Sequence, residues 1–275
     1  MWVAESQYEV LGTRFGVRCD DLAVAERVEI LLEPFRRHTI RPVRARNLFA
    51  LTSHRRGDDR RYAFRDCRRI ARSESWTEVL DGVLAEVNRR AIDEMAYFGV
   101  HAGVVAVASK TIAFPAASGA GKSTLVAACV KAGFEYVSDE ALCLDYSTGS
   151  VIPYLKALNL SRWSIEELAL DFPDDLTSDL TKTPIPADRL GAVAAGDPRK
   201  LSDVVFAERR PGKPNLVEIS PSQVIAGLLR YSFNHFRRPE DAFVLTTELA
   251  RHSQGWKLEY ENPNDAAELM LSASV

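Results

Sequence analysis

Residues 116–124 read Ala-Ala-Ser-Gly-Ala-Gly-Lys-Ser-Thr, and this stretch carries the strongest structural signal in the 275-residue sequence. A short apolar segment precedes it at Thr111 to Phe114, and a second apolar segment follows it at Leu125 to Ala132. A strand, a glycine-rich loop and a helix in this order are the context that a Walker A phosphate-binding loop requires. One position departs from the usual pattern, because Ala116 stands where the first glycine is expected. The stretch therefore predicts a phosphate-binding loop, with a chance glycine-rich turn as the alternative.

The candidate nucleotide-binding residues of this loop are Ser118, Gly119, Ala120, Gly121, Lys122, Ser123 and Thr124. Gly119 and Gly121 have no Cβ, so that successive backbone N–H groups can converge on a phosphate. The first turn of the following helix adds the positive end of its dipole. In loops of this kind the lysine, here Lys122, reaches the β- and γ-phosphates, and a hydroxyl, here that of Ser123, binds Mg²⁺. The loop therefore predicts ATP and Mg²⁺ as ligands.

Two acidic residues, Asp139 and Glu140, follow a short predicted strand at Phe134 to Val137. Asp139 comes only 17 residues after Lys122, a length of chain that holds one helix and one strand. We therefore expect this strand to lie beside the phosphate loop and to present the acid pair at its C-terminal end, where α/β sheets bind ligands. A carboxylate there can bind Mg²⁺ or accept a proton from a substrate hydroxyl. A turn or a helix cap is the alternative interpretation of the pair.

A third element is His101, which heads a predicted strand 21 residues before Lys122 and would by itself be interpreted as structural. A histidine in this place, followed by Ser118-Gly-Ala-Gly-Lys-Ser123 and by Asp139-Glu140, resembles the HPr kinase/phosphorylase superfamily. The phosphate loop and the fold of that superfamily are shared with ATP-dependent phosphoenolpyruvate carboxykinase. The segment Tyr154-Leu155-Lys156-Ala157-Leu158 adds a likeness to the smaller HPr-kinase-related proteins. The specific match covers about residues 100–160.

The resemblance implies a fold and a reaction. The implied fold is an α/β mixed-sheet P-loop core of the HPr kinase/phosphoenolpyruvate carboxykinase type, with an N-terminal α+β region. By likeness to the family, Asp139 acts as the base toward a substrate serine, His101 assists it, and Lys122 holds phosphate. The implied metal ligands are Ser123, Glu140 and Asp139. The implied function is transfer of the γ-phosphoryl group of Mg-ATP to a serine of a small protein or peptide. A small-molecule kinase on the same core and a nucleotide-binding regulator with little catalysis stay open as alternatives.

The chain is expected to divide into an N-terminal α+β region, residues 1–98, and a P-loop kinase domain, residues 99–275. The N-terminal region, which we expect to face the substrate, contains an arginine-rich block at residues 36–72. Thirteen Arg, no Lys and three Asp give this block a charge of +10. Clustered guanidinium groups can bind phosphate, nucleic acid or an acidic peptide. Because aromatic side chains for base stacking are sparse, we expect solvated strands around a turn at Gly57-Asp58-Asp59 and no nucleic-acid site.

Further positively charged positions are candidates for phosphate or substrate contacts, namely Lys156, Arg162 and the turn Arg209-Arg210-Pro211-Gly212-Lys213. For each of them an ordinary solvated charge is the favoured interpretation, because a single charged residue is most often part of a solvated face.

The composition is that of a globular cytoplasmic protein. Hydrophobic residues make up 46% and charged residues 27%, which excludes a disordered or collagen-like chain. The four cysteines contain no C-x-x-C pair, so reduced thiols are expected in place of a disulfide framework or a zinc site. The N-terminus lacks the basic and apolar segments of a signal peptide. The longest run of small apolar residues, Ala102 to Ala108, is far shorter than the roughly 20 residues of a membrane span. We expect no membrane association, and self-association stays open.

Overall fold

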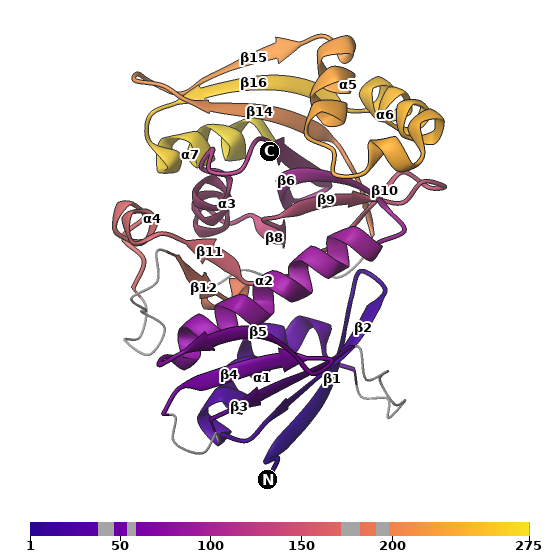
Figure 1. The fold of residues 1–275 in the computed structure, drawn as a ribbon. Helices are drawn as coiled ribbons and strands as arrows, with labels where there is room; N and C mark the ends of the chain where they lie inside the picture. The colour runs from indigo at the N-terminus through magenta and orange to yellow at the C-terminus, as the bar shows by residue number, and fades with distance from the viewer. Residues whose placement is uncertain (38–46, 54–58, 172–181, 191–197, 275) are drawn as a thin grey trace. The chain divides into compact units, whose positions relative to one another are not determined.

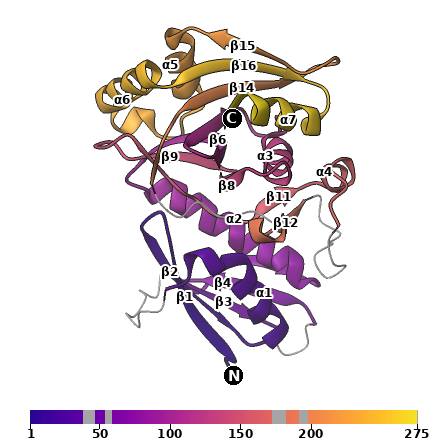
Figure 2. The same ribbon diagram turned by 180° about the vertical axis from the view of Figure 1, so that it is seen from behind.

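The computed structural model describes residues 1–37, 47–53, 59–171, 182–190 and 198–274. The chain forms two compact units, which are drawn in Figure 1 and, from behind, in Figure 2. The first unit comprises Met1–Ala96 and Asp174–Pro184, and the second comprises Tyr97–Pro173 and Ile185–Val275. Each unit combines helices with a sheet of mixed strand directions, which confirms the predicted α/β class.

The first unit contains a five-stranded sheet in the order β1-β2-β3-β4-β5. Its strands are β1 (Ala4–Val10), β2 (Thr13–Cys19), β3 (Leu48–Thr52), β4 (Arg61–Arg65) and β5 (Arg68–Ser73). β2 and β3 are parallel and are connected through helix α1 (Leu22–Leu32), whereas the other neighbouring strands are antiparallel. Tyr8 and Phe15 lie opposite each other on one face of the sheet, and the Tyr8 hydroxyl donates a hydrogen bond to Glu29 of α1 (3.1 Å). This face is therefore the one that the helix covers.

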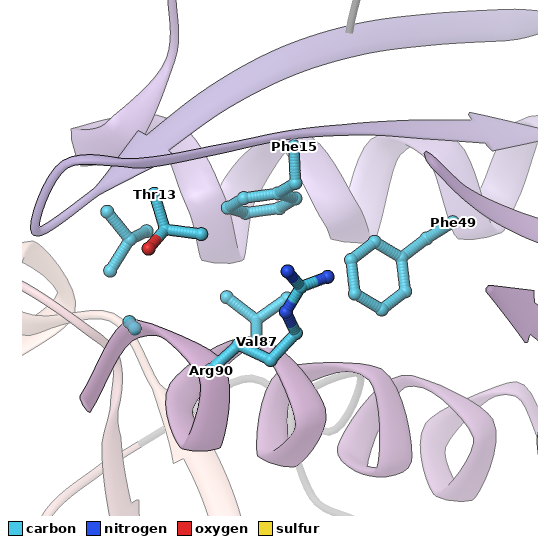
Figure 3. A pocket seen from close by; sticks show the side chains of 7 residues that line it. Thr13, Phe15, Phe49, Val87 and Arg90 are labelled. Atoms are coloured by element: carbon cyan, nitrogen blue, oxygen red, sulfur yellow. The ribbon is translucent and has the colours of Figure 1, made fainter. Parts of the chain in front are cut away.

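The second helix of this unit, α2 (Trp76–Glu94), covers the same face. Figure 3 shows the space between the sheet and α2, where Phe15 and Phe49 lie opposite Val87 and the guanidinium group of Arg90. The cavity left between these side chains has a volume of about 10 Å³, which is room for one water molecule. A small-molecule substrate therefore does not fit into this cavity.

The arginine-rich strands of this unit present much of their charge to solvent. Arg68, Arg69 and Arg72 of β5 are exposed, whereas Arg65 of β4 pairs with Glu86 of α2 (3.2 Å). For β5 the expectation of a solvated arginine-rich face is confirmed, whereas the arginines of β4, Arg61 and Arg65, are half-buried. The predicted strand residues 43–46 and most of the predicted turn, including Gly57 and Asp58, lie outside the described residues.

The second unit is built on a nine-stranded mixed sheet in the order β13-β10-β9-β6-β7-β14-β16-β15, with β8 also paired to β6. Its strands are β6 (Phe98–Val107), β7 (Lys110–Pro115), β8 (Glu135–Ser138), β9 (Ala141–Leu144), β10 (Ser150–Ile152), β13 (Arg199–Lys200), β14 (Asp203–Arg209), β15 (Asn215–Ile219) and β16 (Gln254–Tyr260). The short strands β11 (Leu158–Leu160) and β12 (Thr183–Ile185) lie outside this sheet. β7 is antiparallel to β6 and parallel to β14. The strand that leads into the predicted phosphate loop, β7, is therefore inside the sheet and not at its edge.

Helices cover both faces of this sheet (Figures 1 and 2). They are α3 (Lys122–Lys131), α5 (Pro221–Arg230), α6 (Pro239–His252) and α7 (Pro263–Ser274), while the short helix α4 (Arg162–Glu167) lies next to β11, outside this sheet. Ile112 and Ala113 are neighbours in β7 but belong to two separate apolar cores. The core around Ile112 includes residues of α3 and α7, and the core around Ala113 includes residues of α5 and α6. No helix in the described ranges combines the length and the apolar character that a membrane crossing needs.

Gly103 in β6 allows α3 to lie close to the sheet. A Cβ atom at this position would lie 2.4 Å from Cγ2 of Val126 in α3. We expect Gly103→Ala to lower the free energy of unfolding by about 1–3 kcal/mol, the usual cost of overpacking a filled core. Urea unfolding followed by circular dichroism measures this loss. Val126→Ala makes room for the added methyl group, so the double variant should lose less than the sum of the two single losses. Additive losses would contradict the close contact.

Candidate functional site

The loop of residues 116–121 connects β7 to α3. Gly119 and Gly121 have φ angles of 80° and 89°, in the left-handed region that glycine adopts without strain. Gly121 is also the N-cap of α3 and contributes no capping side chain. The backbone N–H groups in the first turn of α3 are therefore not capped by the N-cap side chain, and they can bind an anion. The loop has the backbone conformation that an anion-binding nest requires.

Lys122 folds back over the loop. Its Nζ donates hydrogen bonds to the carbonyl oxygens of Ala116 (3.2 Å) and Ala117 (2.8 Å), and the residue is buried. By contrast, Ser118 and Ala120 are exposed. The ammonium group is therefore held at the loop itself, and it can reach a phosphate by exchanging these two hydrogen bonds.

The two hydroxyl groups after Lys122 are placed differently. Ser123 is half-buried, and no hydrogen bond to its hydroxyl is present among the described residues. Thr124 is buried, and its Oγ1 lies 2.8 Å from Oγ of Ser164 in α4. The structure therefore leaves Ser123 available to a phosphate-bound metal ion, whereas Thr124 connects α3 to α4.

β6 brings the loop, the histidine and the acid pair together. On one side of this strand, the N–H group of Ala116 donates to the carbonyl oxygen of His101 (3.2 Å). On its other side, His101 pairs with Ala141, and the N–H group of Ala102 donates to the carbonyl oxygen of Glu140 (3.3 Å). The loop of residues 116–121 and the acid pair therefore flank a single strand, with His101 between them.

The position of the acid pair differs from the sequence-based expectation in one respect. The sequence predicts the strand before Asp139 beside the phosphate loop, whereas in the structure β6 separates this strand, β8, from β7, the strand that leads into the loop. β8 and β9 both pair antiparallel with β6, and Asp139-Glu140 interrupts the ladder between them. Oγ of Ser138 accepts hydrogen bonds from the N–H groups of Glu140 (3.3 Å) and Ala141 (3.2 Å) in this interruption. Since β7 and β8 run in the same direction, their C-terminal ends still lie at the same side of the sheet.

Lys156 belongs to this site, and the expectation that it is a solvated charge is wrong. Its side chain is only 12% exposed, and its Nζ lies 3.1 Å from Oδ1 of Asp139 and 3.5 Å from Oε2 of Glu140. Burial lowers the pKa of Lys156, but the two carboxylates outweigh burial and raise the pKa above its usual value. The side chain is therefore a buried, permanently charged ammonium group beside the acid pair.

The other cationic candidates are at the surface, as the sequence favoured. The side chain of Arg162 is 92% exposed, and Arg210 pairs with Glu208 at the surface (2.8 Å). One sequence signal separates Lys156 from them, because it is the single charged residue in the apolar run of residues 151–160. A lone cation in an apolar run, close after an acid pair, indicates a buried ion pair.

His101 is electrostatically linked to both halves of the site. Its Nε2 lies 3.8 Å from Oε1 of Glu140. Burial, and next the charge of Lys122, lower the pKa of His101, while Glu140, Asp139 and a hydrogen bond with the backbone of Ala116 oppose this shift. The imidazole ring is therefore neutral at neutral pH. Because Lys122 and both acids act on the same ring, the loop and the acid pair form one electrostatic cluster.

The site offers few oxygen ligands from the protein, which fits a metal ion that is bound mainly by phosphate oxygens. Within the described residues, no three His, Cys, Asp or Glu side chains are grouped so that they could hold a metal ion. Mg²⁺ in phosphate sites usually takes one or two protein oxygens, and phosphates and water supply the rest. Ser123 can be such a ligand. The metal role predicted for Asp139 and Glu140 stays a prediction, and the ammonium of Lys156 competes with it.

No protein-family model matches the chain, and a search of curated proteins gave no match. The chemistry of the site is therefore derived from its own residues. They provide a loop with an uncapped helix N-terminus and a lysine, an imidazole with a lowered pKa, and a buried carboxylate beside an ammonium group.

Proposed function

We propose that the chain is an ATP-dependent phosphotransferase, and that its second unit is a P-loop core of the HPr kinase/phosphoenolpyruvate carboxykinase type. The observation that carries the proposal is the pairing of β6, which puts the anion-binding loop on one side of His101 and the acid pair on the other. Phosphoryl transfer needs a phosphate-binding cradle and a group that orients the attacking hydroxyl, held close together. The family resemblance of residues 100–160 rests on the same three elements.

In this proposal each residue has a role that its position supports. The first-turn N–H groups of α3 and the ammonium of Lys122 hold the β- and γ-phosphates and stabilise the charge on the transferred group. Mg²⁺ bound to ATP supplies further positive charge to the phosphates, and Ser123 is its protein ligand. Asp139 accepts the proton of the acceptor hydroxyl. His101, in its neutral form, lies against Glu140 and positions the acid pair.

The acceptor that we favour is a serine of a small protein or peptide. The resemblance to the smaller HPr-kinase-related proteins supports this choice. Exposure of the loop is compatible with it, because residues 117–121 are exposed and the side chain of Glu140 is 26% exposed, although the side chain of Asp139 is only 1% exposed. A serine on a macromolecular surface can therefore approach the loop. The alternative kinase reaction would use the hydroxyl group of a small metabolite on the same core.

One observation favours a second candidate function, a nucleotide-binding regulator with little catalysis. The ammonium of Lys156 lies 3.1 Å from Oδ1 of Asp139, the oxygen of the proposed base. This oxygen is therefore already engaged in an ion pair and is less available to the hydroxyl of an acceptor. A regulator of this kind would bind Mg-ATP through the loop and turn it over slowly.

Incubation of the chain with γ-labelled ATP, Mg²⁺ and a cell lysate, followed by mass spectrometry of the labelled species, tests the proposal. A labelled protein or peptide that is lost with Lys122→Ala would support the favoured acceptor. A labelled metabolite would support the small-molecule kinase, and ATP binding without any labelled species would support the regulator. A folded chain that does not bind Mg-ATP would contradict all three functions.

The exposed arginines of β5 provide a prediction about the acceptor. If the acceptor is an acidic peptide, Arg68→Gln/Arg69→Gln should raise the KM for the peptide and leave the KM for ATP unchanged. The effect should shrink as salt rises, because the Debye length falls to about 8 Å at roughly 0.15 M salt. Arg251→Gln is the control, since Arg251 is an exposed arginine of the other unit that pairs with Glu248 (2.5 Å). Unaltered acceptor kinetics at low salt in the β5 variant would contradict the role of these arginines.

A further inference from the structure

Lys156 occupies the kind of position that a divalent metal ion often takes, between two carboxylates. Its Nζ lies 3.1 Å from Oδ1 of Asp139 and 3.5 Å from Oε2 of Glu140. The side chain of Asp139 is only 1% exposed. A buried carboxylate without a compensating charge strongly destabilises a folded protein. One positive charge is therefore required here, and the chain supplies it from its own sequence.

The contact between Lys156 and Asp139 is a buried ion pair. Among the described residues, no donor meets hydrogen-bond geometry at the buried Oδ1 of Asp139, although Nζ lies within ion-pair distance. Nζ also donates to the carbonyl oxygen of Ala157 (3.3 Å). An ammonium group is a compact point charge, so it can stand in for a metal ion next to a carboxylate.

The backbone around Lys156 is attached to the strand that leads into the acid pair. The N–H group of Tyr154 donates to the carbonyl oxygen of Val137 (3.0 Å), and the hydroxyl of Tyr136 donates to the carbonyl oxygen of Lys156 (2.6 Å). Both tyrosines are buried. The ammonium is therefore placed by packed elements of the fold and not by a free surface side chain.

We infer that Lys156 is a built-in cation that takes the place of a divalent metal ion at the acid pair. In the wild-type chain Asp139 and Glu140 bind no divalent ion. The inference concerns the same site as the proposed function. It rests, however, on the contacts of Lys156 and requires no kinase activity.

Mn²⁺ alone, without nucleotide, is the probe, because electron paramagnetic resonance measures its binding directly. The wild-type chain should have no Mn²⁺ site at the acid pair, so Asp139→Asn should leave its Mn²⁺ binding unchanged. Lys156→Ala removes the cation and keeps both carboxylates. It should bind one Mn²⁺ at least about tenfold more tightly than the wild type, which corresponds to about 1.4 kcal/mol.

Two variants are matched controls for this gain. Lys156→Arg keeps a positive charge and should bind Mn²⁺ as the wild type does. Lys156→Ala/Asp139→Asn lacks one of the two carboxylates and should lose the gained site. A gain that persists in this double variant would place the Mn²⁺ elsewhere and overturn the inference.

A folded Lys156→Ala variant without increased Mn²⁺ affinity would also overturn the inference. So would Mn²⁺ binding by the wild type that Asp139→Asn abolishes, and this outcome can be measured whether or not Lys156→Ala folds. If Lys156→Ala unfolds in the absence of metal, Mn²⁺ should restore its circular dichroism spectrum, because a ligand that binds the native state stabilises it. If Mn²⁺ does not restore the spectrum of the unfolded variant, the inference is wrong. None of these outcomes involves ATP or an acceptor, so this inference and the proposed function can fail separately.

Discussion

Replacement of Lys122 by alanine is expected to abolish phosphoryl transfer and to weaken Mg-ATP binding, while the chain stays folded. The carbonyl oxygens of Ala116 and Ala117 hold the ammonium at the loop, so it is positioned before any phosphate binds. Removing one preorganised group that stabilises transition-state charge usually lowers kcat by about 10²–10³-fold. We expect a loss of at least this size, because the lysine also contributes to the binding of the nucleotide.

Titration calorimetry with Mg-ATP and transfer of the γ-label measure the two effects of Lys122→Ala, and circular dichroism verifies the fold. Lys110→Ala is the matched control. It removes the same charge at the opposite end of β7, where Nζ of Lys110 donates to the carbonyl oxygen of Ala273 (3.1 Å). Both activities should persist in this control. Unchanged turnover in folded Lys122→Ala would refute the assignment of residues 116–124 as a phosphate loop.

Replacement of Asp139 by asparagine is expected to preserve Mg-ATP binding and to lower transfer by about 10²–10⁴-fold, the usual contribution of a positioned base. The amide has nearly the same shape as the carboxylate, so the buried site keeps its packing, but the amide does not take up the proton of a hydroxyl. Lys156 retains Glu140 as an ionic partner at 3.5 Å. We therefore expect the variant to fold and to bind Mg-ATP, and to lose only the phosphoryl-transfer step.

Glu135→Gln is the control for Asp139→Asn, because it neutralises a carboxylate at the start of the same strand, β8. Glu135 pairs with Arg199 (2.5 Å), away from the acid pair, and its variant should transfer phosphate normally. Loss of nucleotide binding in Asp139→Asn would indicate that Asp139 is a metal ligand, and it would also speak against Lys156 as the cation of the acid pair. Full activity would remove Asp139 from the reaction.

The sequence predicts the elements of the site whose signals are local. The loop between β7 and α3 follows from glycines at two positions that need a positive φ and from the apolar segments on both sides. The strand β8 and the acid pair after it follow in the same way from a short apolar segment that ends at two carboxylates. These features depend on neighbouring residues only, so they can be recognised without knowledge of the tertiary structure.

The neighbours of each strand could not be predicted in this way. The separation of 17 positions from Lys122 to Asp139 shows that one helix and one strand intervene, but not that β6, which precedes both, lies between β7 and β8. The pairing of Asp203 in β14 with Ile112 in β7 likewise joins positions 91 residues apart. Burial of Lys156 depends on such non-local packing too, so its surroundings, and not its residue type, determine its role.

The order of the strands also has a consequence for the synthesis of this protein. The candidate site lies between His101 and Lys156, so its strands can pair soon after they leave the ribosome, because their contacts are close in sequence. One edge of β7, however, acquires its parallel neighbour only when β14 is made, which begins at Asp203, 88 residues after the end of β7. At a translation rate of about 5–20 residues per second, this interval lasts roughly 4–18 seconds. During that time the nascent chain exposes an unpaired, apolar strand edge, and this is when it is most prone to aggregation.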